Sequence, residues 1–345
     1  MKFAVIGIGK TGQAMAGYLM SRGHDVVLWD RRREKANTVK AVGLRVSGEV
    51  DGYFRPYATT VLAEAVGEAD YVLVMTVAAG HLPVARGLSG SLRAGCRILI
   101  LNGNWGALEF YDELHAELLE KSIVLAETGG MPLISDSDGI GTCVLKKIKN
   151  EMSLAAIPAG DAVPLAEELR EVFPFLSPVR NVVETSINNT NPILHAPIAL
   201  LNISRIENGE DYTFYGDAAS RLVLSYVERA DRERIEIAQR AGAAGQSALE
   251  ILNSFWPTQH DNLYDAVKGN DTYMAGKGPV DLNYRYITED VPYGLAPVVR
   301  LGRALGVEAP YLEAVVRLYS LLFQRDFLQE GPSIEADLLE EAVQG

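Results

Sequence analysis

The sequence predicts an α/β domain built on a doubly wound sheet, followed by an all-α domain. Short apolar runs alternate with helical patterns from the first residues to about residue 184. Beyond that point strand patterns nearly vanish, and long helical patterns follow one another. The length of 345 residues is also comfortable for two domains. We therefore predict domains over residues 1–184 and 185–345.

The first elements are a strand, a glycine-rich turn, a helix and a second strand. Residues 2–6 form an apolar run that is typical of a buried parallel strand. A helical pattern continues to Met20, Gly23 ends the helix, and residues 25–29 form the next strand. The alternation then predicts helices at 61–66 and 107–120 and strands at 71–75, 97–101 and 123–126.

The second domain is predicted from helical periodicity alone. The stretch 185–204 has no charged residue, but its four asparagines, two prolines and His195 argue against a membrane span. We expect it to be a buried polar segment. The predicted helices are 197–206, 218–241, 247–255, 294–305 and 310–327.

Composition and charge exclude several classes of function. The net charge of −13 argues against a nucleic-acid partner, and an anionic substrate would need local arginines. The two cysteines, Cys96 and Cys143, lie far apart and lack metal-ligand spacing, so we expect no metal site and a reducing cytoplasmic location. We see no signal peptide and expect no membrane partner. A homodimer is compatible with the sequence.

The first turn carries a dinucleotide fingerprint, Gly7-Ile8-Gly9-Lys10-Thr11-Gly12. It follows a strand, opens a helix and precedes Asp30 at the end of the second strand, which is the context that this motif requires. Gly7 permits a tight turn, Gly9 lets the backbone approach a pyrophosphate, and Gly12 lets the helix pack against the sheet. The free N–H groups of the helix N-terminus favour the negative charge. The sequence therefore predicts a Rossmann-type domain that binds NAD(H) or NADP(H).

The choice between the two cofactors stays open. Asp30 would accept hydrogen bonds from a ribose 2′-OH, which favours NAD, and would repel a 2′-phosphate. Arg31, Arg32 and Arg33 follow at once, and one of them could bind a 2′-phosphate if Asp30 turns aside. We expect Asp30 and Arg31 to belong to the cofactor site.

Other candidate residues follow the next strands. Thr76 and Val77 end the strand at 71–75, and the carboxyl edge of such a sheet lines the nicotinamide side of the crevice. Asn102, Gly103 and Asn104 end the following strand and face the same crevice. For His81 we expect a solvated loop position.

In the second domain, two segments place polar residues in apolar surroundings. His195 precedes Pro197 and an apolar helix, while Asp290 lies just before Pro292, where a proline marks a helix start. A carboxylate at such a position stays ionised and would orient His195 as a general acid/base for a carbonyl. Arg285 offers a planar fork for one substrate carboxylate.

These segments resemble the octopine/nopaline (opine) dehydrogenase family. The resemblance covers nearly the whole chain and is most specific in Arg285-Tyr-Ile-Thr-Glu-Asp290-Val-Pro-Tyr-Gly294. It is also visible in Asn191-Pro-Ile-Leu-His195 and in residues 200–209. It implies reduction, by NAD(P)H, of the imine formed between an amino acid and a 2-oxo acid such as pyruvate. It further implies His195 and Asp290 as the catalytic pair and Arg285, with Asn191, as substrate-binding residues.

Two alternatives stay open. One is another two-domain dehydrogenase of the glycerol-3-phosphate, 3-hydroxyacid or ketopantoate type, which uses a lysine on a helix as the acid. After residue 184 the sequence has only Lys268 and Lys277, both in a polar, glycine-containing region, and we predict no lysine in the helices. The other alternative is a protein that senses NAD(P) without catalysis.

Overall fold

The computed structural model describes residues 1–334, which form two compact units. The first unit runs from Met1 to Thr185, and the second begins at Ser186. Residues 335–345, the end of the predicted second domain, lie outside the described residues. Each unit is described by itself.

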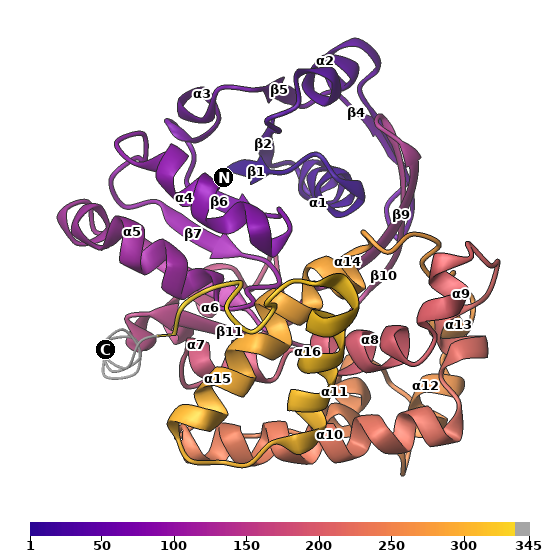
Figure 1. Cartoon of the computed structure of the whole chain (residues 1–345). Helices are drawn as coiled ribbons and strands as arrows, with labels where there is room; N and C mark the ends of the chain where they lie inside the picture. Colours follow the sequence, from indigo (N-terminus) through magenta and orange to yellow (C-terminus); the bar gives the residue numbers. More distant parts are fainter. Residues whose placement is uncertain (335–345) are drawn as a thin grey trace. The chain divides into compact units, whose positions relative to one another are not determined.

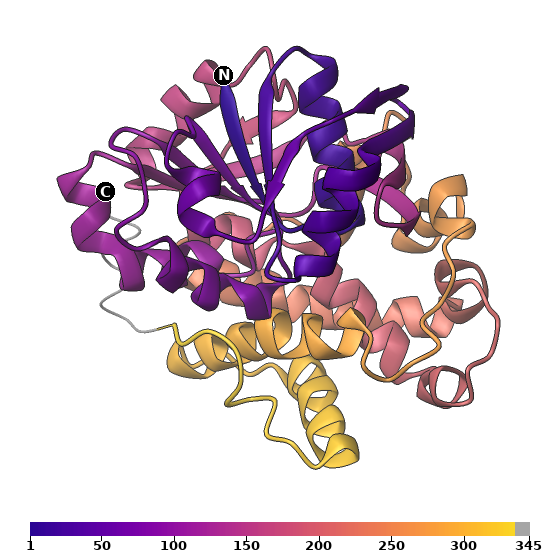
Figure 2. The same cartoon turned by 90° about the horizontal axis from the view of Figure 1, so that it is seen from above.

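The first unit is built on an eight-stranded sheet (Figures 1 and 2). All neighbouring strands run parallel except β8 and β11, which are antiparallel. The spatial order is β12 (Leu176–Pro178), β11 (Met152–Ile157), β8 (Val124–Thr128), β7 (Arg97–Ile100), β6 (Tyr71–Val74), β1 (Lys2–Ile6), β2 (Asp25–Trp29) and β5 (Tyr57–Thr59). The strand at the centre, β1, is buried from Phe3 to Ile6, as its apolar sequence predicts.

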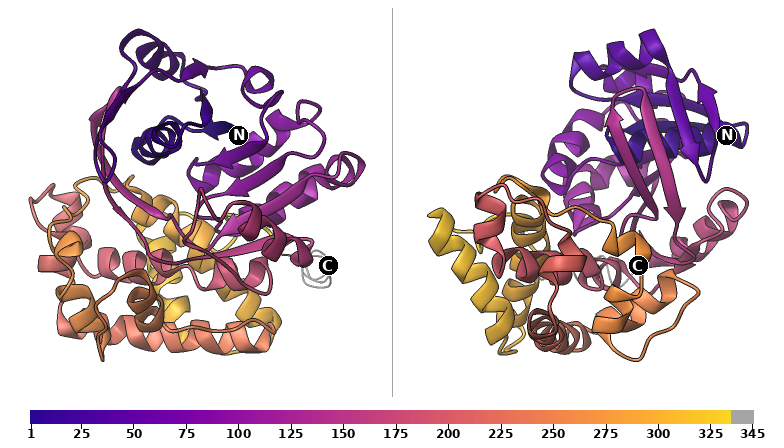
Figure 3. Two further views of the ribbon diagram at one scale, coloured as in Figure 1. Left: turned by 180° about the vertical axis from the view of Figure 1, so that it is seen from behind. Right: turned by 90° about the vertical axis from the view of Figure 1, so that its right-hand side faces the viewer.

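A second sheet, which the sequence analysis did not predict, covers helix α1 (Lys10–Ser21). Its order is β4 (Gly52–Phe54), β3 (Leu44–Gly48), β10 (Thr142–Ile148) and β9 (Leu133–Gly139). Figure 1 shows α1 enclosed by this sheet, and Figure 3 (right) shows its long hairpin face on. The approach is close because a Cβ on Gly17 would lie 2.5 Å from the Val46 side chain.

The helices of the first unit confirm the predicted alternation, with shifts of one or two residues at their ends. The predicted helices 61–66 and 107–120 are α3 (Leu62–Val66) and α5 (Gly106–Glu120). The others are α2 (Arg33–Val42), α4 (His81–Leu88), α6 (Ala162–Glu168) and α7 (Val182–Ile187), with 3₁₀ turns η1 (Ala78–Gly80) and η2 (Ala159–Asp161).

The second unit is helical, as predicted. Its longest helix, α10 (Arg221–Arg240), packs against α8 (Thr190–Leu200) and α16 (Pro310–Phe323). The other helices are α9 (Ile203–Glu207), α11 (Ala248–Phe255), α12 (Leu263–Lys268), α13 (Asp271–Met274), α14 (Arg285–Thr288) and α15 (Ala296–Ala304). Two π-helical turns, η3 (Phe214–Ala218) and η4 (Asp290–Leu295), complete the unit. In the described part of the chain no helix is long and apolar enough to cross a membrane.

One predicted helix boundary was wrong, and it concerns a candidate catalytic residue. The helix expected at 197–206 is two helices, and the first of them, α8, already begins at Thr190. The reason is a cap, because the Asn189 side chain accepts a hydrogen bond from the Asn191 backbone N–H at 3.0 Å. His195 therefore lies within a helix and not before one.

Candidate active site

The glycine-rich loop has the shape that a dinucleotide pyrophosphate requires. Gly7 has φ +123°, and a Cβ on Gly12 would collide with the Gly7 carbonyl oxygen. A Cβ on Gly9 would meet nothing within 4 Å, so the backbone there is open to a ligand. Lys10 and Thr11 form the first turn of α1, whose N-cap residue is Gly9 and has no side chain to cap the helix. These residues fit the cofactor at a helix N-terminus.

Asp30 is turned into the protein at the end of β2. It is only 6% exposed, and its two oxygens accept hydrogen bonds from the backbone N–H groups of Ile8 (3.1 Å) and Arg32 (3.0 Å). The Lys35 ammonium lies 3.2 Å from Oδ2. Burial alone would raise the pKa of Asp30, but the Arg32 N–H and the Lys35 charge outweigh it and hold that pKa below its usual value. The Arg31 side chain, next to it, is exposed.

The loops after β6 and β7 lie at the carboxyl edge of the sheet, where a doubly wound fold binds its ligand. Thr76 is half-buried and Val77 is exposed. In the next loop Asn102, Asn104 and Trp105 all have positive φ, at +69°, +45° and +68°. Non-glycine residues rarely adopt this conformation, and clusters of them are typical of ligand sites. The position of this loop follows from the sequence, but its positive φ angles do not.

His81 is buried, and the expected loop position was wrong. It begins α4, its ring lies 6.4 Å from that of Phe110, and Gly106 packs against it so closely that a Cβ there would collide with the imidazole. Among residues 1–334 neither ring nitrogen has a hydrogen-bond partner. Burial lowers the pKa of His81 to about 4, so the ring is neutral at physiological pH. The ring packs against Gly106, the residue that directly follows the loop after β7.

The structure brings His195 and Asp290 together across 95 residues of sequence. The Asp290 carboxylate oxygen Oδ2 lies 2.7 Å from Nδ1 of His195. Asp290 is fully buried and His195 is 8% exposed. Because the carboxylate only accepts hydrogen bonds, Nδ1 carries the proton, and Nε2 is the ring nitrogen placed for exchange with a substrate.

The local position of Asp290 differs from the prediction. Pro292 lies within the π-helical turn η4, which separates α14 from α15, and so it does not begin an α-helix. Among residues 1–334, Oδ1 of Asp290 has no hydrogen-bond partner, and Oδ2 bonds to His195. Its orientation therefore depends on the imidazole, and the expected contribution of backbone N–H groups to Asp290 was wrong.

Arg285 begins α14, five residues before Asp290, and is held by an acidic neighbour. Its Nε lies 3.3 Å from Oε2 of Glu289, one helical turn later, and the Glu289 side chain is buried. Burial alone would lower the pKa of Arg285, but the Glu289 and Asp290 carboxylates raise it above its ordinary value. The Arg285 side chain is 37% exposed, while its Nε atom is buried.

Asn191 lies on the same face of α8 as His195, one turn earlier, and is half-buried. The sequence analysis did not predict the aromatic ring that lies against His195. Tyr286 stacks on the imidazole with ring centroids 3.9 Å apart. The residue directly follows Arg285 in the chain, but no periodicity in the sequence indicates this contact.

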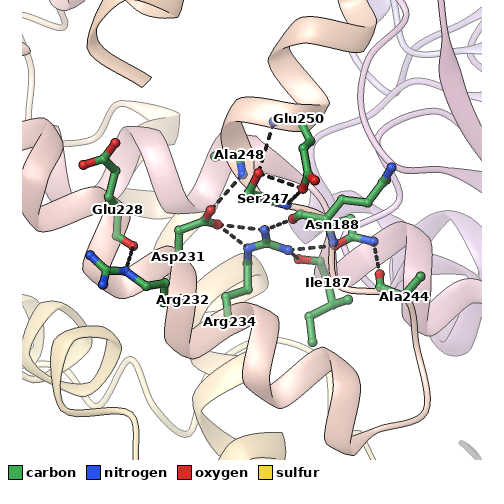
Figure 4. A network of polar contacts seen from close by, with 11 residues as sticks. Ile187, Asn188, Glu228, Asp231, Arg232, Arg234, Ala244, Ser247, Ala248 and Glu250 are labelled. Atoms are coloured by element: carbon green, nitrogen blue, oxygen red, sulfur yellow. Dashed lines mark hydrogen bonds and ion pairs between the residues drawn. The ribbon is translucent and has the colours of Figure 1, made fainter. Parts of the chain in front are cut away.

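A buried polar network fixes the start of α8 (Figure 4). Arg234 of α10 donates to the Ile187 carbonyl and to the Asn188 side chain, both at 2.8 Å, and pairs with Asp231. The second Asp231 oxygen accepts from the Ala248 backbone N–H at 2.7 Å. The three polar side chains, Asn188, Asp231 and Arg234, therefore all have partners, and Asn188 is a structural residue of the polar segment.

The prediction that no lysine lies in the helices after residue 184 was wrong. Lys268 does lie in a helix, as the last residue of α12. Its ammonium donates to the carbonyl oxygens of Tyr215 (2.7 Å) and Gly216 (2.6 Å), so it stabilises the backbone of η3. Lys277 pairs with Asp211 on the surface. Both lysines are engaged in contacts that hold the fold.

Comparison with known proteins agrees with this geometry. Residues 178–323 match the family described as NAD/NADP octopine/nopaline dehydrogenase, alpha-helical domain, and residues 3–126 match ketopantoate reductase PanE/ApbA. An opine dehydrogenase of Arthrobacter sp. (strain 1C) is 32% identical over 338 residues, which are 96% of this chain and 94% of the relative.

Solved structures show the same fold. The chain resembles octopine dehydrogenase in complex with NADH and agmatine, with a TM-score of 0.79, 16% identity, and coverage of 100% of this chain and 95% of that one. It also resembles yersinopine dehydrogenase with NADP+ bound, with a TM-score of 0.78, 15% identity, and coverage of 99% and 97%. From its sequence similarity over nearly its full length, the chain belongs to the opine dehydrogenase family, whose members are NAD(P)-dependent oxidoreductases acting on the CH–NH group of opines.

Proposed function

We propose that this chain catalyses the NAD(P)H-dependent condensation of an amino acid with a 2-oxo acid to give an N-(carboxyalkyl) amino acid. The observation that carries the proposal is the His195–Asp290 pair, with Nδ1 and Oδ2 2.7 Å apart. A histidine ordered in this way by a buried carboxylate is a general acid/base. Arg285 lies five residues before Asp290. It provides a local positive charge for an anionic substrate in a chain whose net charge is −13.

The residues of the second unit have distinct tasks. Arg285 binds the carboxylate of the 2-oxo acid, and Asn191 contributes a polar contact one turn before His195. The amino group of the second substrate attacks the keto carbon, and the protonated His195 gives its Nε2 proton to the oxygen, which leaves as water. The resulting imine is then reduced. Bound NADH or NADPH supplies the hydride for this reduction.

The experiment is an absorbance assay of reduced-cofactor oxidation with pyruvate, with and without a panel of amino acids. Oxidation that needs both substrates supports the proposal. Oxidation with the oxo acid alone would instead indicate a 2-hydroxy acid reductase, and tight cofactor binding without oxidation would indicate a sensor. His195→Ala should lower kcat by roughly 10²–10⁴ with little change in cofactor affinity. Wild-type turnover in that variant would remove His195 from the mechanism.

We also propose that the arginines after β2, and not Asp30, decide the use of NADPH. Both Asp30 oxygens already accept hydrogen bonds from backbone N–H groups. Arg31 and Arg32 are exposed beside it, and Arg32 also pairs with Asp30, with Nε 3.3 Å from Oδ1. A lost charge-assisted contact to a 2′-phosphate costs about tenfold to a hundredfold in affinity. Arg31→Ala/Arg32→Ala should therefore reduce kcat/KM for NADPH by that factor and change the value for NADH less. Arg22→Ala, at the far end of α1, is the matched control, and equal losses for both cofactors would contradict the proposal.

A further inference from the structure

The imidazole of His195 is covered on one face by a tyrosine ring. The Tyr286 and His195 rings are nearly parallel, at an interplanar angle of 27°, with centroids 3.9 Å apart. We propose that Tyr286 is a positioning residue that stabilises the protonated form of His195 through the face of its ring. This inference rests on the proposed acid/base role of His195, and it assigns to the same site a residue that acts through the imidazole.

The tyrosine is itself held in place by two further rings. Phe214 is buried, and its ring centroid lies 4.5 Å from that of Tyr286. The Tyr284 ring meets the Tyr286 ring nearly edge to face, with centroids 4.8 Å apart and an interplanar angle of 82°. Phe214 also presents an edge-on contact to His195 at 5.7 Å and 73°. The stack is therefore preorganised, and holding it costs little side-chain entropy when the imidazole gains its proton.

The ring acts as a neutral π-system and not as an anion. Burial raises the pKa of Tyr286 well above the ordinary value of a phenol, and burial does the same for Tyr215, whose ring lies 6.2 Å from that of His195. The negative face of an aromatic ring attracts a cation within about 6 Å of its centroid. At 3.9 Å the Tyr286 ring is well inside this range, and a protonated imidazole meets it face on.

The effect of the Tyr286 ring on His195 can be separated from the effects of the charged groups around α8. From η4, Asp290 bonds to Nδ1 of His195; from α14, the Arg285 cation is paired with Glu289. From α16, the Tyr319 hydroxyl donates to the Ala196 carbonyl, and burial keeps it protonated by raising its pKa. These groups are all unchanged when only the ring of residue 286 is altered.

Three further helices, α9, α10 and α11, pack on α8, and Arg205 of α9 pairs with Glu210. Asp231 and Arg234 of α10 form a buried pair at the start of α8, where Arg234 also bonds to Asn188. On α11, Glu250 forms a capping box with Ser247.

The consequence is a shift in the pH at which His195 releases its proton. A cation–π contact of this kind raises the pKa of the imidazole by about 0.5 to 1 unit. The acid needed to expel water is the protonated form, so loss of the ring should reduce activity first at the alkaline side of the pH profile. A purely structural ring would change kcat without moving the profile.

The direct test is an NMR titration of the full chain labelled in its histidines, of which there are only five. Tyr286→Phe keeps the ring and should leave the pKa of His195 unchanged. Tyr286→Leu removes the ring and should lower it by about 0.5 to 1 unit. Tyr311→Leu removes a ring that meets Tyr226 and not the imidazole, and it serves as the control, with no shift expected.

Two results would overturn the inference. One is an unchanged His195 pKa in Tyr286→Leu, and the other is an equal fall in Tyr286→Phe, which would assign the effect to the hydroxyl. If Tyr286→Leu does not fold, Tyr286→Met replaces it, with the same expected shift and the same criterion. The titration needs no substrate, so it tests the role of Tyr286 independently of the proposed reaction. A parallel shift of the kcat/KM profile would then connect the two.

Discussion

Replacing Asp290 by asparagine tests the central interaction of the candidate active site. The substitution keeps the size of the side chain but removes a fully buried charge that lies 2.7 Å from Nδ1 of His195. The new amide can also donate to Nδ1, which would place the imidazole proton on the opposite nitrogen. Both changes disfavour the imidazolium, in which both ring nitrogens are protonated. The imidazolium is the form of His195 that gives up a proton from Nε2.

The size of the effect follows from the charge separation. Opposite unit charges with centres about 4 Å apart interact by about 4 kcal/mol at an effective dielectric constant of about 20. That energy corresponds to about 3 pKa units, or a factor of about 10³ in the population of the imidazolium at a pH above its pKa. We therefore expect kcat/KM in the reductive direction to fall by roughly 10²–10⁴ at neutral pH. Because a carboxylate beside an imidazole favours the protonated ring, loss of Asp290 should move the alkaline limb of the pH profile to lower pH.

The assay is steady-state oxidation of the reduced cofactor as a function of pH, together with cofactor affinity measured by fluorescence. Cofactor affinity should stay at the wild-type value, because Asp290 is remote in sequence from the glycine-rich loop and belongs to the second unit. In a His195→Ala background, Asp290→Asn should cause little further loss, since the two residues act as one group. Independent, additive losses in the double variant would refute the reasoning.

Three further predictions concern the substrate, the cofactor loop and the fold. Arg285→Lys replaces a planar fork by a point charge, so the KM for the 2-oxo acid should rise about tenfold to a hundredfold while kcat changes less; an unchanged KM would remove Arg285 from carboxylate binding. Gly12→Ala puts a Cβ against the Gly7 carbonyl, and a fluorescence titration should show loss of NADH and NADPH binding; wild-type affinity would contradict the packing argument. Arg234→Met leaves the buried Asp231 unpaired and should lower the free energy of unfolding by about 3–5 kcal/mol in urea denaturation. Adding Asp231→Leu should restore part of that loss, and a single-variant cost below about 1 kcal/mol would show that the network is dispensable.

The nucleotide-binding half of the site could be predicted because its information is local. The fingerprint from Gly7 to Gly12 places its glycines where each is needed for a turn or a close approach, and the apolar strands around it are continuous. The second sheet could not be predicted in the same way. Its two halves are far apart in sequence, since β3 ends at Gly48 and β10 begins at Thr142, and both strands pack on α1.

The cofactor preference shows where local information ends. Asp30 and the arginines after it are adjacent opposite charges, and the sequence does not indicate which of them faces the cofactor. The structure turns Asp30 inward because the backbone N–H groups of Ile8 and Arg32 satisfy its two oxygens. The choice of cofactor and the homodimer both stay predictions.

The sequence alone therefore determined the fold class, the dinucleotide loop and the identities of the candidate acid/base His195, its carboxylate partner Asp290 and the cation Arg285. These follow from periodicity, from backbone requirements at glycines and from motifs, all of which are properties of short stretches of chain. Only the tertiary structure decided that Asp290 meets His195 through its carboxylate, that Glu289 restrains Arg285, and that Tyr286 lies on the imidazole. The physical reason is distance along the chain: residues 195 and 290 are 95 positions apart, and packing of α14 and η4 against α8 sets which of their atoms face each other.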